Sequence, residues 1–328
     1  MDTGTHVVMG VGLGGLATLD PNVTQDPVMM QAVMIATIVG SQAPDFDTVL
    51  KFKNNAVYIR NHRGPTHSIP AVLMWPILIS AVIYGFVPDI NLLHLWLWTF
   101  LAVFLHVFVD IFNAYGTQAL SPFNKRWIAL GVINIFDPLI FLSHIAAFIL
   151  WRYGAHPGWT FLILYILLIF YYVWRIRARN KVVTHARRLH PSTTHVFISP
   201  TFQWNKWHLV IRTPEMLHVA ESKDHQIRYF ESYEFEPIPG DEITQAAIKD
   251  DNLSAFLSFS PTYRWIMRKT EDGYEVKFID LRYRTKGYYP FVAVVRLNQD
   301  LEILTSYTGW IYSDETLEKK LKQGRVST

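Results

Sequence analysis

The sequence contains no cysteine among its 328 residues. Disulfide bonds and thiolate metal sites are therefore excluded, so any bound metal would be held by histidine and carboxylate side chains. Charge is also scarce, because charged residues make up 17% of the chain and the formal net charge is only +3. So small a net charge gives no reason to expect nucleic acid as a partner.

Repeats and low-complexity tracts are missing as well, and the first residues lack the basic stretch and cleavage site of a removable signal peptide. What is present is an uneven distribution of apolar residues. The chain is mostly apolar up to about Trp174 and becomes charged and mixed from Arg175 onward. The apolar segments fall at residues 6–19, 28–43, 69–87, 92–109, 136–151 and 159–174.

Crossing a bilayer takes about 20 largely apolar residues. The third, fourth and sixth segments reach this length with their flanks, whereas the first is short and glycine-rich and the second and fifth carry polar residues at one end. Counting all six as spans predicts an all-α polytopic membrane bundle with both termini in the cytoplasm. A soluble protein with buried helices is the alternative, but the sixth segment carries no charge and argues against it.

Basic residues are distributed as the positive-inside rule requires for this six-span topology. The loops assigned to the cytoplasm hold twelve Lys and Arg residues, and those assigned to the opposite side hold only Arg152. The twelve are Lys51, Lys53, Arg60, Arg63, Lys125, Arg126, Arg175, Arg177, Arg179, Lys181, Arg187 and Arg188. We therefore expect a multi-pass protein of the cell (inner) membrane, with the lipid bilayer as its first partner.

Two domains are predicted, a membrane-embedded domain over residues 1–178 and a cytoplasmic α+β domain over residues 179–328. In the second, a helical pattern covers residues 241–259, and turn residues at Asp272-Gly273 and Asn298-Gln299 indicate two hairpins. Runs typical of strands fall at residues 194–200, 207–213 and 227–236. A cytoplasmic protein partner would bind through this domain.

Histidine and aspartate residues collect at the predicted cytoplasmic ends of the helices, at one membrane depth. His106 and Asp110 are spaced i,i+4, so both can point from one helix face toward one ion. That pair alone also fits a neutral histidine hydrogen-bonded to a carboxylate in a packed bundle. The gathering of further ligand-type residues favours a metal site. The set is His6, Asp45, Asp47, His62, His67, His106, Asp110 and Asp137.

The segment "RNHRGPTHS", residues 60–68, precedes the third apolar segment. Gly64-Pro65 breaks the chain there, so His67 and Arg63 can be presented from a turn. Arg63 carries a planar guanidinium suited to phosphate or carboxylate, although it also satisfies the positive-inside rule. His62 stays open between a ligand, a residue behind a ligand and an interfacial residue.

The motifs "THVVMG", "PDFD", "HRGPTHS", "HVFVD", "SPF" and "FDP" occur in this order over residues 1 to about 175. Here the chain resembles the membrane-bound metal-dependent hydrolases of the YdjM/YfhP type, and its length is most similar to the YfhP branch. The resemblance implies a distant similarity to zinc-dependent phospholipase C, with a phospholipase-C-like helical core. It implies as metal ligands His6, Asp45, His67, His106 and Asp110.

The expected cofactor is a divalent metal, zinc first, with manganese or iron as alternatives. The soluble phospholipases also use an N-terminal Trp as a ligand, where this chain has Met1, so one or two ions are expected rather than three. Asp47 or Asp137 would act as a base or orient a ligand, and Arg63 would stabilise phosphate charge.

These features together predict an integral membrane hydrolase that cleaves a phosphoester, such as a phospholipid head group, at the cytoplasmic face. A non-catalytic metal-sensing or scaffold protein whose C-terminal domain binds a partner remains an alternative. A transporter is a further one, but transport needs ionisable residues that step through the membrane, and here they collect at one face.

Overall fold

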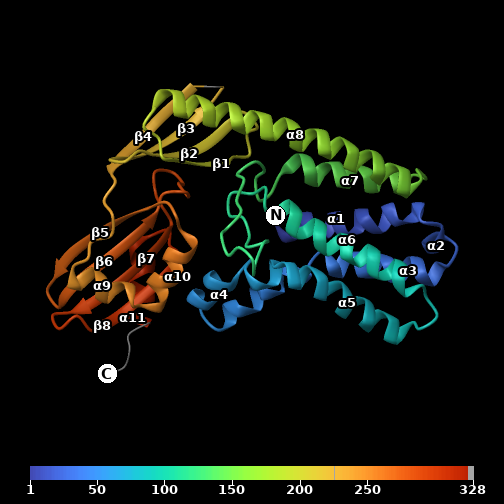
Figure 1. Cartoon of the computed structure of the whole chain (residues 1–328), viewed down its shortest axis with the longest axis horizontal. Helices are drawn as coiled ribbons and strands as arrows, with labels where there is room; N and C mark the ends of the chain where they lie inside the picture. The colour runs from blue at the N-terminus through green and yellow to red at the C-terminus, as the bar shows by residue number, and fades with distance from the viewer. Residues whose placement is uncertain (225, 324–328) are drawn as a thin grey trace. The chain divides into compact units, whose positions relative to one another are not determined.

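The computed structural model describes residues 1–224 and 226–323 (Figure 1). The chain forms two compact units. The helical unit comprises Met1–Asp47, His62–Lys181 and Ser199–Trp204. The sheet unit comprises Thr48–Asn61, Val182–Ile198 and the described residues from Asn205 onward. Each unit is thus assembled from segments that are separate in the sequence.

Six apolar helices lie in the helical unit, the last of them as far as Lys181, and each overlaps one of the apolar segments of the sequence. Asp26, Ser68 and Asp137 are N-cap residues whose side chains accept hydrogen bonds from backbone N–H groups of the first turn. Each cap is followed by a proline at the first or second helical position, a common start signal. The helices are α1 (Thr3–Leu16), α3 (Pro27–Gly40), α5 (Ile69–Phe86), α6 (Leu92–Asp110), α7 (Pro138–Arg152) and α8 (Pro157–Leu189).

Helices α5, α6 and α8 are long and apolar enough to cross a membrane. The other three are shorter, with 14 residues in α1 and α3 and 15 in α7. At 1.5 Å per residue they are about 21–23 Å long, which is less than the hydrocarbon thickness of about 30 Å. The chain is therefore membrane-associated with three candidate spans, and the prediction of six spans is not supported. The side on which each terminus lies stays a prediction.

Helices α1, α3 and α6 pack against one another, and α5 packs on α6 (Figure 1). The close approach of α1 to α3 depends on Gly10, where a Cβ would lie 2.4 Å from Ser41 Oγ and 2.9 Å from the carbonyl oxygen of Thr37. A larger residue at position 10 would push the two helices apart. This packing also positions the end of α3, because Ser41 is its C-cap residue.

The sheet unit contains two four-stranded antiparallel sheets, with strand orders β1-β2-β3-β4 and β5-β6-β7-β8. In the second sheet Val276 pairs with Val295, which pairs in turn with Ser306. The strands are β1 (His195–Pro200), β2 (Lys206–Arg212), β3 (Met216–Lys223), β4 (Gln226–Glu234), β5 (Tyr263–Thr270), β6 (Gly273–Asp280), β7 (Phe291–Asn298) and β8 (Ile303–Trp310).

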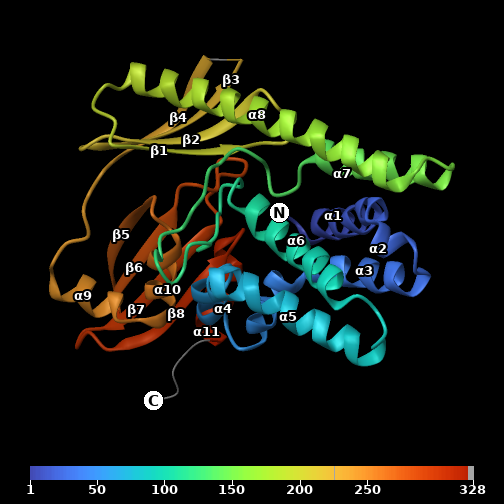
Figure 2. The ribbon, with the colours of Figure 1, turned by 45° about the vertical axis from the view of Figure 1, so that its right-hand side comes forward.

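Helices α9 (Glu242–Ile248) and α10 (Asp251–Phe259) pack on the second sheet, as Figure 2 shows. Phe256 of α10 stacks on Phe291 of β7 with ring centroids 5.3 Å apart, in the core of this sheet. Two further helices, α4 (Asn55–Asn61) and α11 (Asp314–Gln323), pack against α10 and β8 respectively.

The two sheets and their helices agree with the predicted α+β class. The predicted strands correspond to β1, β2 and β4, and the turn residues Asp272-Gly273 and Asn298-Gln299 lie where β5 meets β6 and where β7 leads to β8. Strand β3 and helix α11 were not predicted. The sequence of α11, "DETLEKKLKQ", has only two apolar residues, Leu317 and Leu321, and both are buried.

Candidate metal centre

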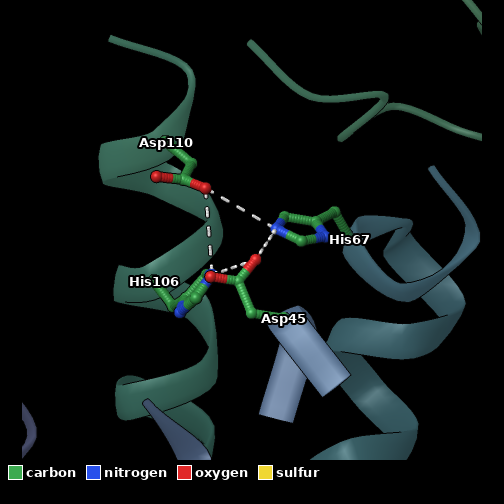
Figure 3. A group of neighbouring side chains, drawn as sticks. All are labelled: Asp45, His67, His106 and Asp110. Carbon is green, nitrogen blue, oxygen red and sulfur yellow. Dashed lines mark ion pairs between the residues drawn. The ribbon is translucent and has the colours of Figure 1, made fainter. Parts of the chain in front are cut away.

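Four of the predicted ligands meet at one point of the helical unit (Figure 3). Asp45 comes from the 3₁₀ helix η2 (Ala43–Phe52) and His67 from the 3₁₀ turn η3 (Pro65–His67). His106 and Asp110 come from the last turns of α6. The four ligand atoms all lie within 4.8 Å of one another. The i,i+4 spacing does place His106 and Asp110 on one face, with Nε2 3.8 Å from Oδ2.

The distances between these atoms are close to those around a tetrahedral ion. His67 Nε2 lies 3.6 Å from Asp45 Oδ1 and 3.6 Å from Asp110 Oδ2. His106 Nε2 lies 3.7 Å from Asp45 Oδ1. Ligands bound at about 2.1 Å to a tetrahedral ion are separated by about 3.4 Å. The cluster is therefore slightly wider than a four-coordinate zinc site, and its nitrogen and oxygen donors suit zinc, manganese or iron.

The burial of these four side chains also supports a metal site. The side chains of His67, His106 and Asp110 are 0% exposed and that of Asp45 is 17% exposed. Within residues 1–224 and 226–323, none of the four ligand atoms finds a hydrogen-bond partner. A buried polar atom without a hydrogen bond costs about 1–3 kcal/mol, so four together need an explanation, even though Asp110 Oδ2 also forms an ion pair with Arg63. One divalent ion would satisfy them all, with Asp45 on the side open to solvent.

Hydrogen bonds on the far side of each imidazole turn Nε2 toward the cluster. His106 Nδ1 donates to the carbonyl oxygen of Ser41 at 2.6 Å. His67 Nδ1 lies 3.1 Å from Thr66 Oγ1. Such bonds select the tautomer with an unprotonated Nε2 and fix the orientation of the ring. The contact between α1 and α3 at Gly10 therefore helps to position His106, because Ser41 ends α3 and its carbonyl oxygen accepts the hydrogen bond from His106.

Asp45 and His67, the two members of the cluster outside α6, have protonation states suited to a metal. Burial, reinforced by the neighbouring His106, lowers the pKa of His67 well below its usual range. Burial by itself would raise the pKa of the Asp45 carboxyl, but the His106 imidazole and the charge of Arg63 outweigh burial and hold that pKa well below its usual range. A neutral imidazole and an ionised carboxylate are the forms that bind metals.

His6, the fifth predicted ligand, lies beside the four-residue cluster rather than within it. Its ring stacks on His106 with centroids 3.6 Å apart, and its Nε2 is 3.4 Å from Asp110 Oδ1. The amino group of Met1 lies 2.9 Å from His6 Nε2 and forms an ion pair with Asp110. Sequence reasoning missed the amino group of Met1, because a backbone group carries no signal in the residue pattern.

Arg63 is buried against the cluster, with 6% of its surface exposed. Its NH2 group lies 3.2 Å from Asp110 Oδ2 and donates to the carbonyl oxygen of Met1 at 3.1 Å. The Nε and NH1 groups have no acceptor in the part of the chain that the structure describes. The backbone has a φ of 59°, which costs a non-glycine residue about 1–3 kcal/mol. A strained turn thus presents two unused guanidinium donors beside the ligands.

Asp47 holds the loop that carries Arg63 and His67. Its Oδ2 accepts hydrogen bonds from the Arg63 backbone N–H at 2.9 Å and from Thr66 Oγ1 at 2.7 Å. Its Oδ1 lies 2.8 Å from Nδ1 of His62, whose side chain is 24% exposed. Both oxygens are therefore engaged, which favours an orienting role for Asp47 over a base. The ligand atoms of Asp45, Asp47 and His62 also lie within 4.8 Å of one another.

Asp137 is not brought to the cluster. Its Oδ1 caps α7 by accepting from the backbone N–H groups of Leu139 at 3.0 Å and Ile140 at 3.3 Å. Its Oδ2 accepts from the hydroxyl of Tyr171 at 2.7 Å. The capping geometry aims the carboxylate at its own helix, so Asp137 is not placed to act as a base at this site. His94 likewise pairs elsewhere, with Asp20 at 2.5 Å.

The helical unit with its three candidate spans and buried His/Asp cluster defines a membrane protein with a candidate metal centre. The family described as YdjM inner membrane protein matches residues 1–182, and the chain belongs to this family. The remainder matches two domains of the YfhP type. The YfhP middle domain matches residues 191–233, and the YfhP C-terminal alpha/beta plait domain matches residues 242–321.

A relative from Bacillus subtilis (strain 168), described as uncharacterized protein YfhP, is 57% identical over 328 residues. The match covers 99% of this chain and 100% of the relative, which agrees with the expected YfhP branch. No solved structure matches the chain. These matches do not point to a hydrolase or to phospholipase C, so that part of the resemblance stays a prediction.

Proposed function

We propose that the protein is an integral membrane, metal-dependent hydrolase that cleaves a phosphoester at the cytoplasmic face of the inner membrane. The supporting observation is the position of four buried ligand atoms without hydrogen-bond partners beside the two unused donors of Arg63, within the described residues. A phosphoester needs both features, because a cation can bind one phosphoryl oxygen while a guanidinium binds another. The partial exposure of Asp45 leaves one side of the cluster open for it.

A divalent ion held by Asp45, His67, His106 and Asp110 would polarise a phosphoryl oxygen and lower the pKa of a bound water. Arg63 donates from its unused NH1 group to a phosphate oxygen, and its charge stabilises the charge that develops in the transition state. Asp47 keeps the loop in place through its bonds to Arg63 and Thr66. His62 stands at the exposed edge, where its contact with Asp47 orients the ring for proton transfer.

The test separates a hydrolase from a metal sensor, which would bind the ion without turnover. Protein purified in detergent is stripped with a chelator, reloaded with zinc, manganese or iron, and assayed with a chromogenic phosphodiester and with phospholipid. We expect turnover that depends on the added metal. His67→Ala should lower this turnover by at least about 100-fold, because removing a ligand costs more than the 10- to 100-fold lost when a residue that only orients a ligand is replaced.

The matched control is His156→Ala, because this histidine is exposed and lies at the other end of the spans, just before α8. Its metal content and turnover should equal those of the wild type. Stoichiometric metal binding without turnover of any phosphoester would contradict the hydrolase and favour a metal-sensing or scaffold protein.

A further inference from the structure

A second feature of the helical unit is an apolar groove between α5 and α6. Its volume is about 360 Å³, and all eleven lining residues are aliphatic or phenylalanine. Helix α5 contributes Ile69 and Leu73, and α6 contributes Phe104 and Phe108. Its size and lining are in the range of small-molecule sites. Because both walls belong to candidate spans, a ligand in the groove would reach it from the membrane.

The groove begins at the level of the metal cluster. Its lining residues Val107 and Ile111 directly follow the ligands His106 and Asp110 along α6. An α-helix is about 10–12 Å across, so the two sites are separated by no more than the width of α6. On the other wall, Ile69 follows His67 by two residues, at most about 7 Å of chain. The glycerol backbone of a lipid can bridge such a separation between phosphate and acyl chain.

The length of the groove matches one leaflet. From Ile111 to Phe100 it follows α6 over eleven residues, about 16 Å at 1.5 Å per residue. Half of a hydrocarbon core of about 30 Å is about 15 Å. Phe100, Phe104 and Phe108 stack in succession, with ring centroids 6.0 Å and 5.7 Å apart, and form a continuous wall along this length. The dimensions are those of one acyl chain in the leaflet nearest the cluster.

Charge near the groove indicates which lipid would occupy it. Leu120 and Ile128 belong to the loop that also carries Lys125 and Arg126, and the backbone of this loop is hydrogen-bonded to that of Ile69 and Ile111. Both basic residues are exposed and would lie among head groups, where their positive charges attract anionic lipids. An anionic phospholipid therefore fits the apolar groove, the basic loop and the phosphate-binding Arg63 together.

We propose that this groove binds an acyl chain of an anionic phospholipid whose phosphate lies at the metal centre, so that the substrate is a membrane lipid. This inference rests on the proposed hydrolase, from which it takes the reaction. The inference specifies the substrate as a lipid that enters laterally from the bilayer, in place of a water-soluble phosphoester. The competing occupant is ordinary annular lipid, which would exchange freely and would not depend on the shape of the groove.

The test narrows the groove with Leu73→Trp and, independently, with Phe104→Trp. The matched control is Leu78→Trp, on the same helix and similarly exposed at 51% against 47% for Leu73, but outside the groove lining. Delipidated protein in detergent is titrated with dioleoylphosphatidylglycerol, and retained lipid is counted by native mass spectrometry. We expect the groove variants to bind this lipid about tenfold more weakly than the control, which corresponds to about 1.4 kcal/mol.

The second measurement is the ratio of turnover on dioleoylphosphatidylglycerol to turnover on a short-chain, soluble phosphodiester. This ratio should fall about tenfold in the groove variants relative to Leu78→Trp, while metal content shows that all variants fold. Equal lipid retention and an equal turnover ratio in all forms would overturn the proposal that the groove binds an acyl chain and would leave annular lipid as its only occupant. Weaker retention without hydrolysis by any form would keep the lipid site but overturn the hydrolase, so the two failures are distinguishable.

Discussion

Arg63→Lys separates the charge of Arg63 from its shape. Lysine keeps a positive charge near Asp110, whose Oδ2 lies 3.2 Å from the Arg63 NH2 group. It also keeps the charge that the positive-inside rule counts in this loop. What it loses is the planar guanidinium, with its Nε and NH1 donors that find no acceptor among the described residues. A single ammonium group cannot contact Asp110 and a phosphate oxygen from fixed positions in one plane, as a guanidinium can.

The expected effect follows from the role assigned to these donors. Losing one preorganised donor to a transition-state oxyanion costs about 2–4 kcal/mol, which is about 30- to 1000-fold in rate. Turnover and metal content are measured on the same preparations of wild type and Arg63→Lys. We expect bound metal to be unchanged and turnover to fall within that range. Wild-type turnover would refute the reasoning and return Arg63 to a topological role.

Three further predictions concern the support of the site and its orientation. Asp47→Asn should weaken metal affinity by about 10- to 100-fold without removing a ligand, measured by competition with a chelator, because Asp47 holds the loop of Arg63 and Thr66. Gly10→Ala should lower the free energy of unfolding by about 1–3 kcal/mol, measured by thermal or denaturant unfolding. Gly85→Ala should not lower it, because within the described chain a Cβ at Gly85 would meet nothing within 4 Å. Asn54→Cys should be labelled only from the cytoplasm and Asp89→Cys only from outside, because α5 lies between the two positions. The label reports one site in each variant, because the sequence contains no cysteine. Labelling of both variants from one side would contradict α5 as a span.

Much of the candidate site could be predicted, because its ligands follow local rules. The i,i+4 spacing of His106 and Asp110 holds in any helix, and an apolar segment that ends at them sets their depth. Asp45 and His67 follow Pro44 and Pro65, which break the chain and bring short polar segments toward the helix ends. These positions depend on backbone geometry that the residues themselves specify.

Other features depend on tertiary contacts that no local pattern contains. Asp137 has the same residue type and predicted depth as the ligands, but its position before Pro138 makes it a helix cap. Depth alone cannot distinguish a cap from a ligand. The predicted number of six spans is not supported for a related reason. Apolar runs of similar composition became helices of 14 to 33 residues, and the three helices of 14 or 15 residues are shorter than a bilayer crossing. The stacking of His6 on His106 likewise arises from the packing of α1 against α6.

The central claim is that Asp45, His67, His106 and Asp110 bind one divalent ion, and elemental analysis of purified protein tests it most directly. Asp110→Asn and His106→Gln keep the size and polarity of the side chain but weaken or remove the ligand atom. We expect metal bound in near-stoichiometric amount in the wild type and in His156→Ala, and its loss in both ligand variants. Equal metal content in all four proteins, or none in the wild type after reloading, would contradict the metal centre.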